Sequence, residues 1–236
     1  MSGNVAPKIV RDSSLVLCLD AANTKSFQVG TIKWLDLSGD KLNATLYSGA
    51  TYSSLNGGCI TFDGVDAYGD IPNTISLLPS VGSGTIDFVY KLNATSSING
   101  SDFLNIWGFT NNLFQYESNS GFMTFVWRYT DLTYNGLSSG IVYGDFNTYH
   151  ITCTYTSTIG SSTSSTFKIY KNGLSIGNST IPKPLISSNN SLLFGGTGSI
   201  RGNNCNIYNF KIYNRELSAS EVLQNYNAVK SRFGLS

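Results

Sequence analysis

The sequence predicts an all-β sandwich closed by one C-terminal helix. Many short segments alternate apolar with polar residues, which is the period of a strand with one buried face. Clusters of Gly, Asn, Ser and Pro separate these segments, as turns do in β-sandwiches. One segment near the end instead repeats its apolar residues at helical spacing. The 236 residues fit one large β domain, so we expect an N-terminal arm over 1–14, a sandwich over 15–217 and a helix over 218–236.

The strand-like segments follow one another along the chain. Both faces of 15–20 (LVLCLD) are largely apolar, as in a central strand that is covered on both sides. The later segments are 59–63, 85–91, 103–109, 122–129, 148–156, 166–173, 192–194 and 206–213. The segment 166–173 ends in Asn172–Gly173, a strong hairpin signal. The serine-rich stretch 157–165 is interpreted as a hairpin loop, not a linker, because alternation resumes at Phe167.

The helix carries both of its end signals. Ser218 and Glu221 form the S-x-x-E pattern of a capping box. Lys230 and Arg232 follow in the expected last turn, and Gly234 comes after it, as helix C-termini prefer. The apolar residues between these ends lie at helical spacing and predict a buried stripe: Val222, Tyr226, Val229 and Phe233. Such a helix is expected to pack on the sandwich or on a partner.

Composition excludes several classes of function. Charged residues are 12% of the chain and the formal net charge is +1, so no basic field can neutralise the phosphates of a nucleic acid. His150 is the single histidine, which excludes a His-rich metal site and leaves a Ser–His–Asp triad dependent on it. The cysteines lack C-x-x-C spacing and are interpreted as buried thiols, not zinc ligands: Cys18, Cys59, Cys153 and Cys205.

The opening segment, MSGNVAPKIVRDSS, has no hydrophobic period and is interpreted as an arm. It lacks the apolar stretch of a secretory signal, so we expect none. No part of the chain approaches the roughly 18 apolar residues of a membrane-spanning helix. We therefore expect no membrane partner.

Five blocks in order resemble the laminin-G-like branch of the concanavalin A-like lectin/glucanase domains. They are LVLCLDAANTKSF at the opening, WLDLSG at 34–39, ITFDGVDAYGDI at 60–71, TYHITCTYT with FKIYKNGLSIG, and IYNFKIYNRELSASEV. The matching segments extend from about Leu15 to Phe233. The resemblance implies a concanavalin A-like jelly-roll β-sandwich with one C-terminal α-helix.

The opening LCLDAANTKSF and the ending NYNAVKSRFGL also resemble domains in virion proteins of tailed bacteriophages. This resemblance implies a non-enzymatic virion surface protein: a capsid decoration, a head fibre or a tail-fibre adhesin. It would be assembled in the host cytoplasm, oligomeric in the particle, and bound to other virion proteins through its arm or helix. Its lectin-like face would bind cell-surface glycans. A free carbohydrate-binding module is the alternative, and a glycoside hydrolase is a third.

Catalytic and metal-binding patterns are weak. Glycoside hydrolysis needs two carboxyl groups flanking the bond, and the E-x-D-x-x-E run of the glucanase branch is absent. The only glutamates are Glu117, Glu216 and Glu221, and the last two belong to the helix cap region. Asp36, Asp63 and Asp66 are interpreted as turn residues, although the last two could ligate a cation. We expect no enzyme activity, no cofactor and no metal site.

The candidate ligand-binding residues lie in the aromatic middle strands: Trp107, Trp127, Arg128 and Tyr129. Sugars can stack on exposed aromatic rings, so these residues could form a glycan platform. Core packing and a protein interface are the alternatives for the two tryptophans, and alternation places Arg128 on the face opposite Trp127 and Tyr129. His150 lies among threonines on the polar face of its strand and is expected at the surface or in a groove.

Overall fold

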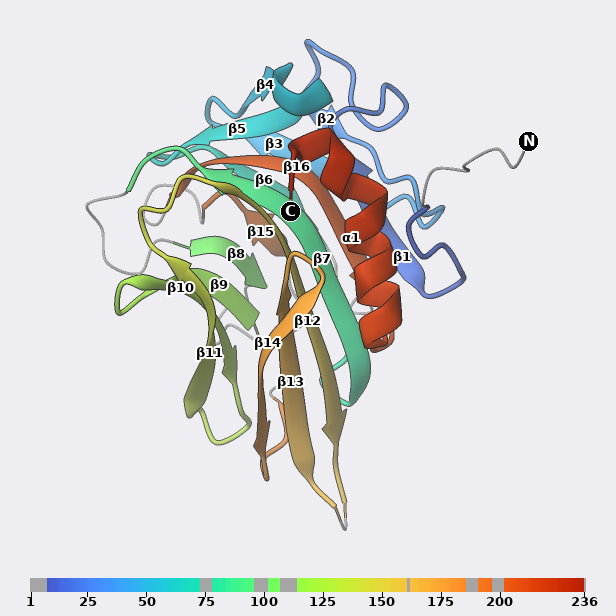
Figure 1. Ribbon diagram of the computed structural model, residues 1–236, viewed down its shortest axis with the longest axis vertical. Helices are drawn as coiled ribbons and strands as arrows, with labels where there is room; N and C mark the ends of the chain where they lie inside the picture. Colours follow the sequence, from blue (N-terminus) through green and yellow to red (C-terminus); the bar gives the residue numbers. More distant parts are fainter. Residues whose placement is uncertain are drawn as a thin grey trace.

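The computed structural model describes residues 8–72, 78–95, 102–106, 114–160, 162–185, 191–196 and 202–235. It confirms a β-sandwich with one α-helix near the C-terminus (Figure 1). The first strands are β1 (Leu15–Asp20), β2 (Lys33–Trp34), β3 (Ala44–Tyr47), β4 (Thr51–Ser53), β5 (Cys59–Asp63), β6 (Tyr68–Ile71), β7 (Gly82–Leu92) and β8 (Asp102–Ile106). The later ones are β9 (Phe114–Asn119), β10 (Phe122–Arg128), β11 (Tyr134–Val142), β12 (Thr148–Thr158), β13 (Ser164–Lys171), β14 (Leu174–Ile181), β15 (Leu192–Phe194) and β16 (Asn204–Tyr213). A 3-10 turn, Leu55–Gly57, precedes β5, and the helix α1 is Ala219–Phe233.

The strands form two antiparallel sheets that face each other. Sheet I has the order β14-β13-β12-β7-β16-β5-β4, and β1 also pairs with β16. Sheet II has the order β11-β10-β9-β8-β15-β6-β3-β2. The main hydrophobic cluster contains residues from both sheets, among them Phe88, Ile151 and Phe210 from sheet I and Phe125 and Phe194 from sheet II. The jelly-roll core therefore lies between the sheets.

The central strands of sheet I are buried on both faces because α1 covers the outer one (Figure 1). Near the start of the helix, Val222 packs with Tyr170 and Tyr213 of the sheet. Near its end, Val229 and Phe233 pack with residues of three strands: Cys59, Val89 and Tyr208. The helix thus supplies a second, smaller hydrophobic layer outside the sandwich.

Local signals account for the bounds of α1. The Ser218 side chain accepts from the Glu221 backbone N–H and the Glu221 side chain accepts from Ser218 N, so the predicted capping box is present. Gly234 adopts the left-handed conformation at φ 61°, and its N–H donates to the Lys230 carbonyl. These contacts satisfy backbone groups that helix ends otherwise leave unpaired.

The predicted turns are also observed. Asn172 and Gly173 have φ of 50° and 78°, as a two-residue turn between β13 and β14 requires. Strands β12 and β13 pair directly across the serine-rich stretch, which is therefore a hairpin loop. Asp36 accepts from Ser38 N at 2.8 Å, and Asp63 accepts from Val65 N at 2.8 Å, so both carboxylates stabilise tight turns.

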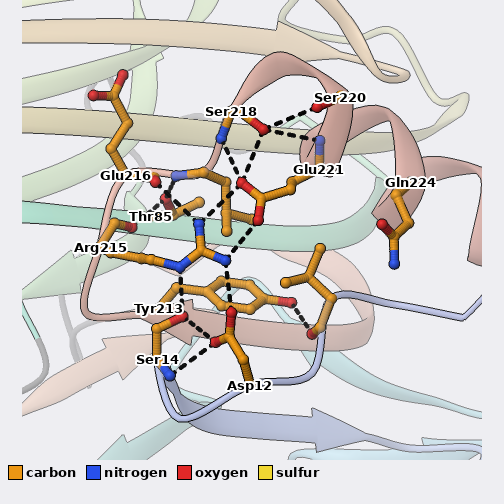
Figure 2. Close-up of polar contacts among 12 residues, drawn as sticks. Asp12, Ser14, Thr85, Tyr213, Arg215, Glu216, Ser218, Ser220, Glu221 and Gln224 are labelled. Carbon is orange, nitrogen blue, oxygen red and sulfur yellow. Dashed lines mark hydrogen bonds and ion pairs between the residues drawn. The ribbon is translucent and has the colours of Figure 1, made fainter.

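Residues 8–14 pack against the domain. Val10 N donates to Asn225 Oδ1 at 2.8 Å, and the Tyr213 hydroxyl donates to the Val10 carbonyl at 3.0 Å. Arg215 joins this segment to the helix cap, because it contacts Asp12 at 2.7 Å and Glu221 at 2.6 Å (Figure 2). Strand β16, the segment 8–14 and the start of α1 are therefore held at one point.

Candidate ligand-binding sites

Two of the predicted binding residues, Trp127 and Tyr129, do not form an exposed platform in the structure. Trp127 and Tyr129 are each only 1% exposed. The Trp127 ring stacks on Phe167 of the opposite sheet with 3.7 Å between ring centroids, and its Nε1 donates to the Tyr129 hydroxyl at 2.6 Å. Both rings therefore belong to the core, which for Trp127 was the alternative to a glycan platform, and their placement offers no face for sugar stacking.

The two other candidates give less information. Arg128 is partly buried and lies on the outer face of β10, opposite Trp127 as the alternation predicted. Trp107 lies outside the described residues. Ligand binding by these four residues stays a prediction, and the burial of Trp127 and Tyr129 directs attention to other parts of the surface.

His150 is fully buried, so its expected surface position was wrong. The polar face of β12 lies beneath α1, and a polar network forms there around Asp87 of β7. Asp87 contacts His150 Nε2 at 3.0 Å, Lys211 Nζ at 2.5 Å and Thr152 Oγ1 at 3.0 Å. Asn225 of α1 also donates to Asp87, at 3.2 Å. Alternation identified a second polar face but could not say that a helix covers it.

This network joins elements and does not form a reaction centre. Burial acts to raise the pKa of Asp87, but Lys211 and His150 outweigh burial and hold that pKa well below its ordinary value. The carboxylate therefore stays ionised and accepts hydrogen bonds from two strands and the helix. Asp87 and His150 are fully enclosed, so no substrate reaches the pair in this structure.

An exposed pair of tyrosines lies on the outer face of sheet II. Tyr47 of β3 and Tyr68 of β6 are cross-strand partners, and their rings stack with 4.8 Å between centroids and 16° between planes. Tyr47 is 40% exposed. Polar residues on the same face adjoin the pair, and Lys33 Nζ donates to Thr45 Oγ1 at 2.6 Å. We call this area the tyrosine surface: Lys33, Thr45, Tyr47, Tyr68 and Asp70.

Asp70 is the unusual member of the tyrosine surface. Its Oδ1 atom is enclosed and has no hydrogen-bond partner among the described residues. Burial raises the pKa of Asp70, and the hydrogen bond with Ser191 opposes that shift. Burial also raises the pKa of Tyr68, and the neighbouring Tyr47 and Asp70 add to the effect. A carboxylate with unused acceptor capacity therefore lies beside a partly exposed aromatic pair.

A pocket of about 400 Å³ lies on the other side of the molecule, at the C-terminal end of α1. It is lined by Lys91 of β7, residues 146–149 at the start of β12, Asn172 of the β13–β14 turn and residues 233–235. We call it the Lys91 pocket. Its lining contains no Asp or Glu. The pocket therefore offers a cation and neutral polar groups, but not paired carboxylates.

Sequence reasoning missed Tyr47, Tyr68, Asp70 and Lys91. A signal existed for the first three, because each occupies the polar face of a short alternating strand. Their meeting depends on the pairing of β3 with β6, which alternation alone does not reveal. Within the described part of the chain, no cluster of three or more His, Cys, Asp or Glu residues could hold a metal ion. The four cysteines are buried thiols.

Comparison with known proteins identifies the fold family. A family model described as the concanavalin A-like lectin/glucanases superfamily matches residues 63–223. No curated protein sequence matches the chain. Within the described ranges, no helix has the length and apolar character needed to cross a membrane.

Several solved structures have a similar fold. The binding domain of Paraclostridial Mosquitocidal Protein 1 superposes with a TM-score of 0.71 at 17% identity, covering 94% of this chain and 55% of that one. The receptor-binding domain of botulinum neurotoxin type G gives 0.67 at 14% identity, covering 90% and 51%. The binding domain of botulinum neurotoxin DC in complex with SialylT gives 0.69 at 15% identity, covering 92% and 52%. The chain thus spans about half the length of these domains, and the likeness is one of fold.

Proposed function

Because the chain belongs to the concanavalin A-like lectin/glucanase superfamily, we propose that it is a lectin-like recognition domain that binds glycans through the tyrosine surface. The observation that carries this proposal is the exposed ring of Tyr47, which Tyr68 holds in place by stacking. Pyranose rings have an apolar face of C–H groups that packs on aromatic rings, whereas their hydroxyls need polar partners at the edge. Aromatic surface with a few fixed polar groups is the usual composition of small-ligand sites.

The neighbours of Tyr47 supply those polar partners. Lys33 and Thr45 carry donor groups on the same face of the sheet, and Asp70 lies next to Thr45 across the strand pair. The surface is open, so each contact is expected to be weak, and strong attachment would come from several copies binding together.

The similar solved domains support this class of function. They are described as binding or receptor-binding domains, and one structure contains botulinum neurotoxin DC bound to SialylT. Another contains the same toxin's binding domain with rat synaptotagmin II, a protein partner. A protein ligand is therefore the second candidate for this chain, and a glycan-binding measurement separates the two.

We propose that the domain is not an enzyme. Hydrolysis of a glycosidic bond needs two carboxyl groups with the substrate between them. The Lys91 pocket has no carboxylate in its lining, and the Asp87–His150 pair is sealed beneath α1. One assay result would instead support a glycoside hydrolase. The chain would have to release reducing ends from a polysaccharide, and a single carboxylate substitution would have to abolish that release.

At a finer level, we propose that the domain is displayed on a bacteriophage particle as a capsid decoration, head fibre or tail-fibre adhesin. The support is the resemblance of the opening and ending segments to such virion proteins. Other virion proteins would be the partners of the arm or helix, and cell-surface glycans would be the outward ligands. A free carbohydrate-binding module is the alternative, in which the isolated domain binds sugar without any assembly.

The glycan proposal is tested with Tyr47→Ala. Binding to a panel of neutral oligosaccharides is measured by ligand-observed NMR on the full chain, and Tyr134→Ala is the control because Tyr134 is 68% exposed on β11 of the same sheet. We expect Tyr47→Ala to weaken binding about tenfold, the loss of roughly one aromatic contact. Unchanged binding by Tyr47→Ala, or no binding by the wild type, would refute the tyrosine surface as a glycan site.

The display proposal is tested by incorporation into particles. A chain lacking residues 1–7 keeps the described contacts of residues 8–14 with the domain, so any loss of incorporation would report a lost anchor. We expect this shortened chain to fold, to bind sugar and to be absent from purified particles. Full incorporation would contradict the arm as the anchor and direct attention to α1.

A further inference from the structure

The Lys91 pocket has the features of a second binding site, separate from the tyrosine surface. Alternation along β7 places Asp87, Val89 and Lys91 on the outer face of sheet I. Helix α1 covers the first two, because Asp87 contacts Asn225 and Val89 packs with Val229 and Phe233. The helix ends at Phe233, so Lys91 lies just past its end, in the pocket lining. A strand that is otherwise covered thus presents one cation to solvent.

Lys91 differs from two other sheet I lysines, Lys168 and Lys211, in having no ion-pair partner. Lys168 pairs with Glu216 at 2.8 Å, and Lys211 pairs with Asp87 at 2.5 Å. Lys91 is partly buried, and its Nζ atom makes no ion pair or hydrogen bond with any described residue. Partly burying a cation without a partner is unfavourable, and a bound anion removes that cost.

A second donor in the pocket is held in a fixed orientation. The Asn172 Oδ1 atom accepts from His150 N at 3.1 Å, so the Nδ2 group of the same amide is left as a donor without a described partner. Asp145 directly precedes the pocket segment 146–149. Its carboxylate already accepts hydrogen bonds from the Tyr149 hydroxyl at 2.6 Å and from Asn147 Nδ2 at 2.7 Å. Lys171 adds positive charge nearby, with its Nζ 5.8 Å from the Tyr149 ring.

The remaining walls favour a sugar over a bare ion. Phe146 is 46% exposed and offers an apolar ring at the rim. The last turn of α1 contributes the negative end of the helix dipole, which opposes a small anion but accepts hydrogen bonds from hydroxyl groups. A volume of about 400 Å³ lies within the range of roughly 300–1,000 Å³ that small-ligand sites occupy.

We propose that the Lys91 pocket binds a sugar that carries a carboxylate, such as a hexuronic acid. The carboxylate contacts Lys91 Nζ and Asn172 Nδ2, the C–H face of the ring packs on Phe146, and hydroxyls donate to the carbonyl groups at the end of α1. This assignment goes beyond the neutral-glycan proposal, because it names a different site with a different chemical preference.

The probes are D-glucuronate, its methyl ester, acetate and inorganic phosphate, each titrated into the isotopically labelled full chain by NMR. We expect glucuronate to shift signals of residues 146–149, 172 and 233–235, and to bind about tenfold or more tightly than the ester, since a charge-assisted hydrogen bond is lost. Equal binding of acid and ester would overturn the proposal. Acetate or phosphate binding as tightly as glucuronate would also overturn it, because the sugar would then contribute nothing.

Variants complete the test. Lys91→Gln is expected to reduce glucuronate affinity about tenfold, whereas Lys25→Gln, at an exposed loop lysine, leaves it unchanged. Phe146→Ala at the exposed rim is a second variant that does not disturb the core, and we expect it to weaken acid and ester alike. Neutral-sugar binding at Tyr47 is measured in the same samples and should persist in Lys91→Gln. Wild-type glucuronate affinity in both pocket variants would refute the site while leaving the tyrosine surface untouched.

Discussion

Several polar residues of this protein are buried, although their strand positions predicted a solvated face. Thr85, Asp87, His150 and Thr152 occupy faces that alternate as solvated strand faces do, and each is fully buried. Alternation reports that two faces differ in polarity, but it does not report what covers the polar one. Hydrogen bonding to Asp87 makes the burial tolerable, because a buried polar group is costly only when it is unpaired.

The substitution Lys211→Met tests how much the buried network contributes to the free energy of unfolding. The substitution leaves Asp87 enclosed without its main counter-charge, so we expect the free energy of unfolding to fall by about 3–5 kcal/mol. Lys168→Met is the matched control, because it breaks a more exposed lysine–glutamate pair on the same sheet and should cost at most about 1 kcal/mol. Urea denaturation of both variants gives the comparison, and equal losses would contradict a structural role for the network.

The predicted and the observed candidate binding residues also differ in how far the local sequence reveals their surroundings. The predicted Trp127 and Tyr129 are large aromatics in a strongly apolar strand, and they packed as such residues usually do. The observed candidates, Tyr47 and Lys91, stand singly in less aromatic segments. Their significance comes from exposure and from missing partners, which are properties of the folded surface and not of the local sequence.

Elements were predicted best where short-range chemistry decides them. The capping box of α1, its glycine end and the Asn172–Gly173 turn need only a few neighbouring residues, and all three are observed. Strands were predicted less completely, because β2, β3, β4, β6, β9 and β11 are absent from the predicted segments, although the three-residue β15 was among them.

Gly64→Ala tests a turn that also joins two strands. Gly64 has φ of 77°, and a Cβ built there would lie 2.7 Å from the Asn204 backbone nitrogen at the start of β16. Gly121 has a similar φ of 84° but open space around it, so Gly121→Ala isolates the cost of the backbone conformation. We expect about 1–2 kcal/mol for Gly121→Ala and clearly more for Gly64→Ala, measured by urea denaturation. Equal costs would mean that Asn204 moves freely.

The Arg215 contacts predict how the junction of residues 8–14 with α1 responds to acid. Hydrogen bonds from Ser14 and Arg215 lower the pKa of Asp12 from 3.8 to about 2, and Arg215 lowers the pKa of Glu221 from 4.5 to about 2. Both carboxylates therefore stabilise the fold above their unfolded pKa values, and this stabilisation is lost as the pH falls through that window to about 2.

Arg215→Gln should weaken that dependence. Unfolding free energies from pH 6 to pH 2 should decline less steeply in the variant, because its Asp12 and Glu221 have lost the charge that lowers their pKa values. At pH 7 we expect a loss of about 1 kcal/mol, since the ion pairs are partly exposed. Parallel curves for the two proteins would refute the assignment.

At the scale of the whole molecule, the sequence predicted the architecture but not which distant segments lie side by side. Alternation and the family resemblance led to a sandwich with a C-terminal helix, and both features are observed. The Lys91 pocket, however, combines four segments that are distributed between residues 91 and 235, and the tyrosine surface depends on the register of β3 with β6. Such contacts follow from the strand order within each sheet, which local patterns leave undetermined.

Two truncations test how the N-terminal segment contributes to the domain. Removing residues 1–14 deletes the Val10–Asn225 and Asp12–Arg215 contacts and uncovers part of the apolar layer under α1, so we expect the melting temperature to fall by several degrees. A chain lacking only residues 1–7 keeps these contacts and serves as the comparison. Circular dichroism melts give both values, and a neutral 1–14 deletion would contradict the role of these contacts.

The bond between Val10 and Asn225 has a consequence for biosynthesis. Its partners are 215 positions apart, so the ribosome makes the first one long before the second exists. Until α1 leaves the exit tunnel, Asp87 and the strand faces around it are open to water, and the nascent domain cannot seal. The outer face of sheet I can therefore be covered only after α1, which follows all the described strands in the sequence, has been made.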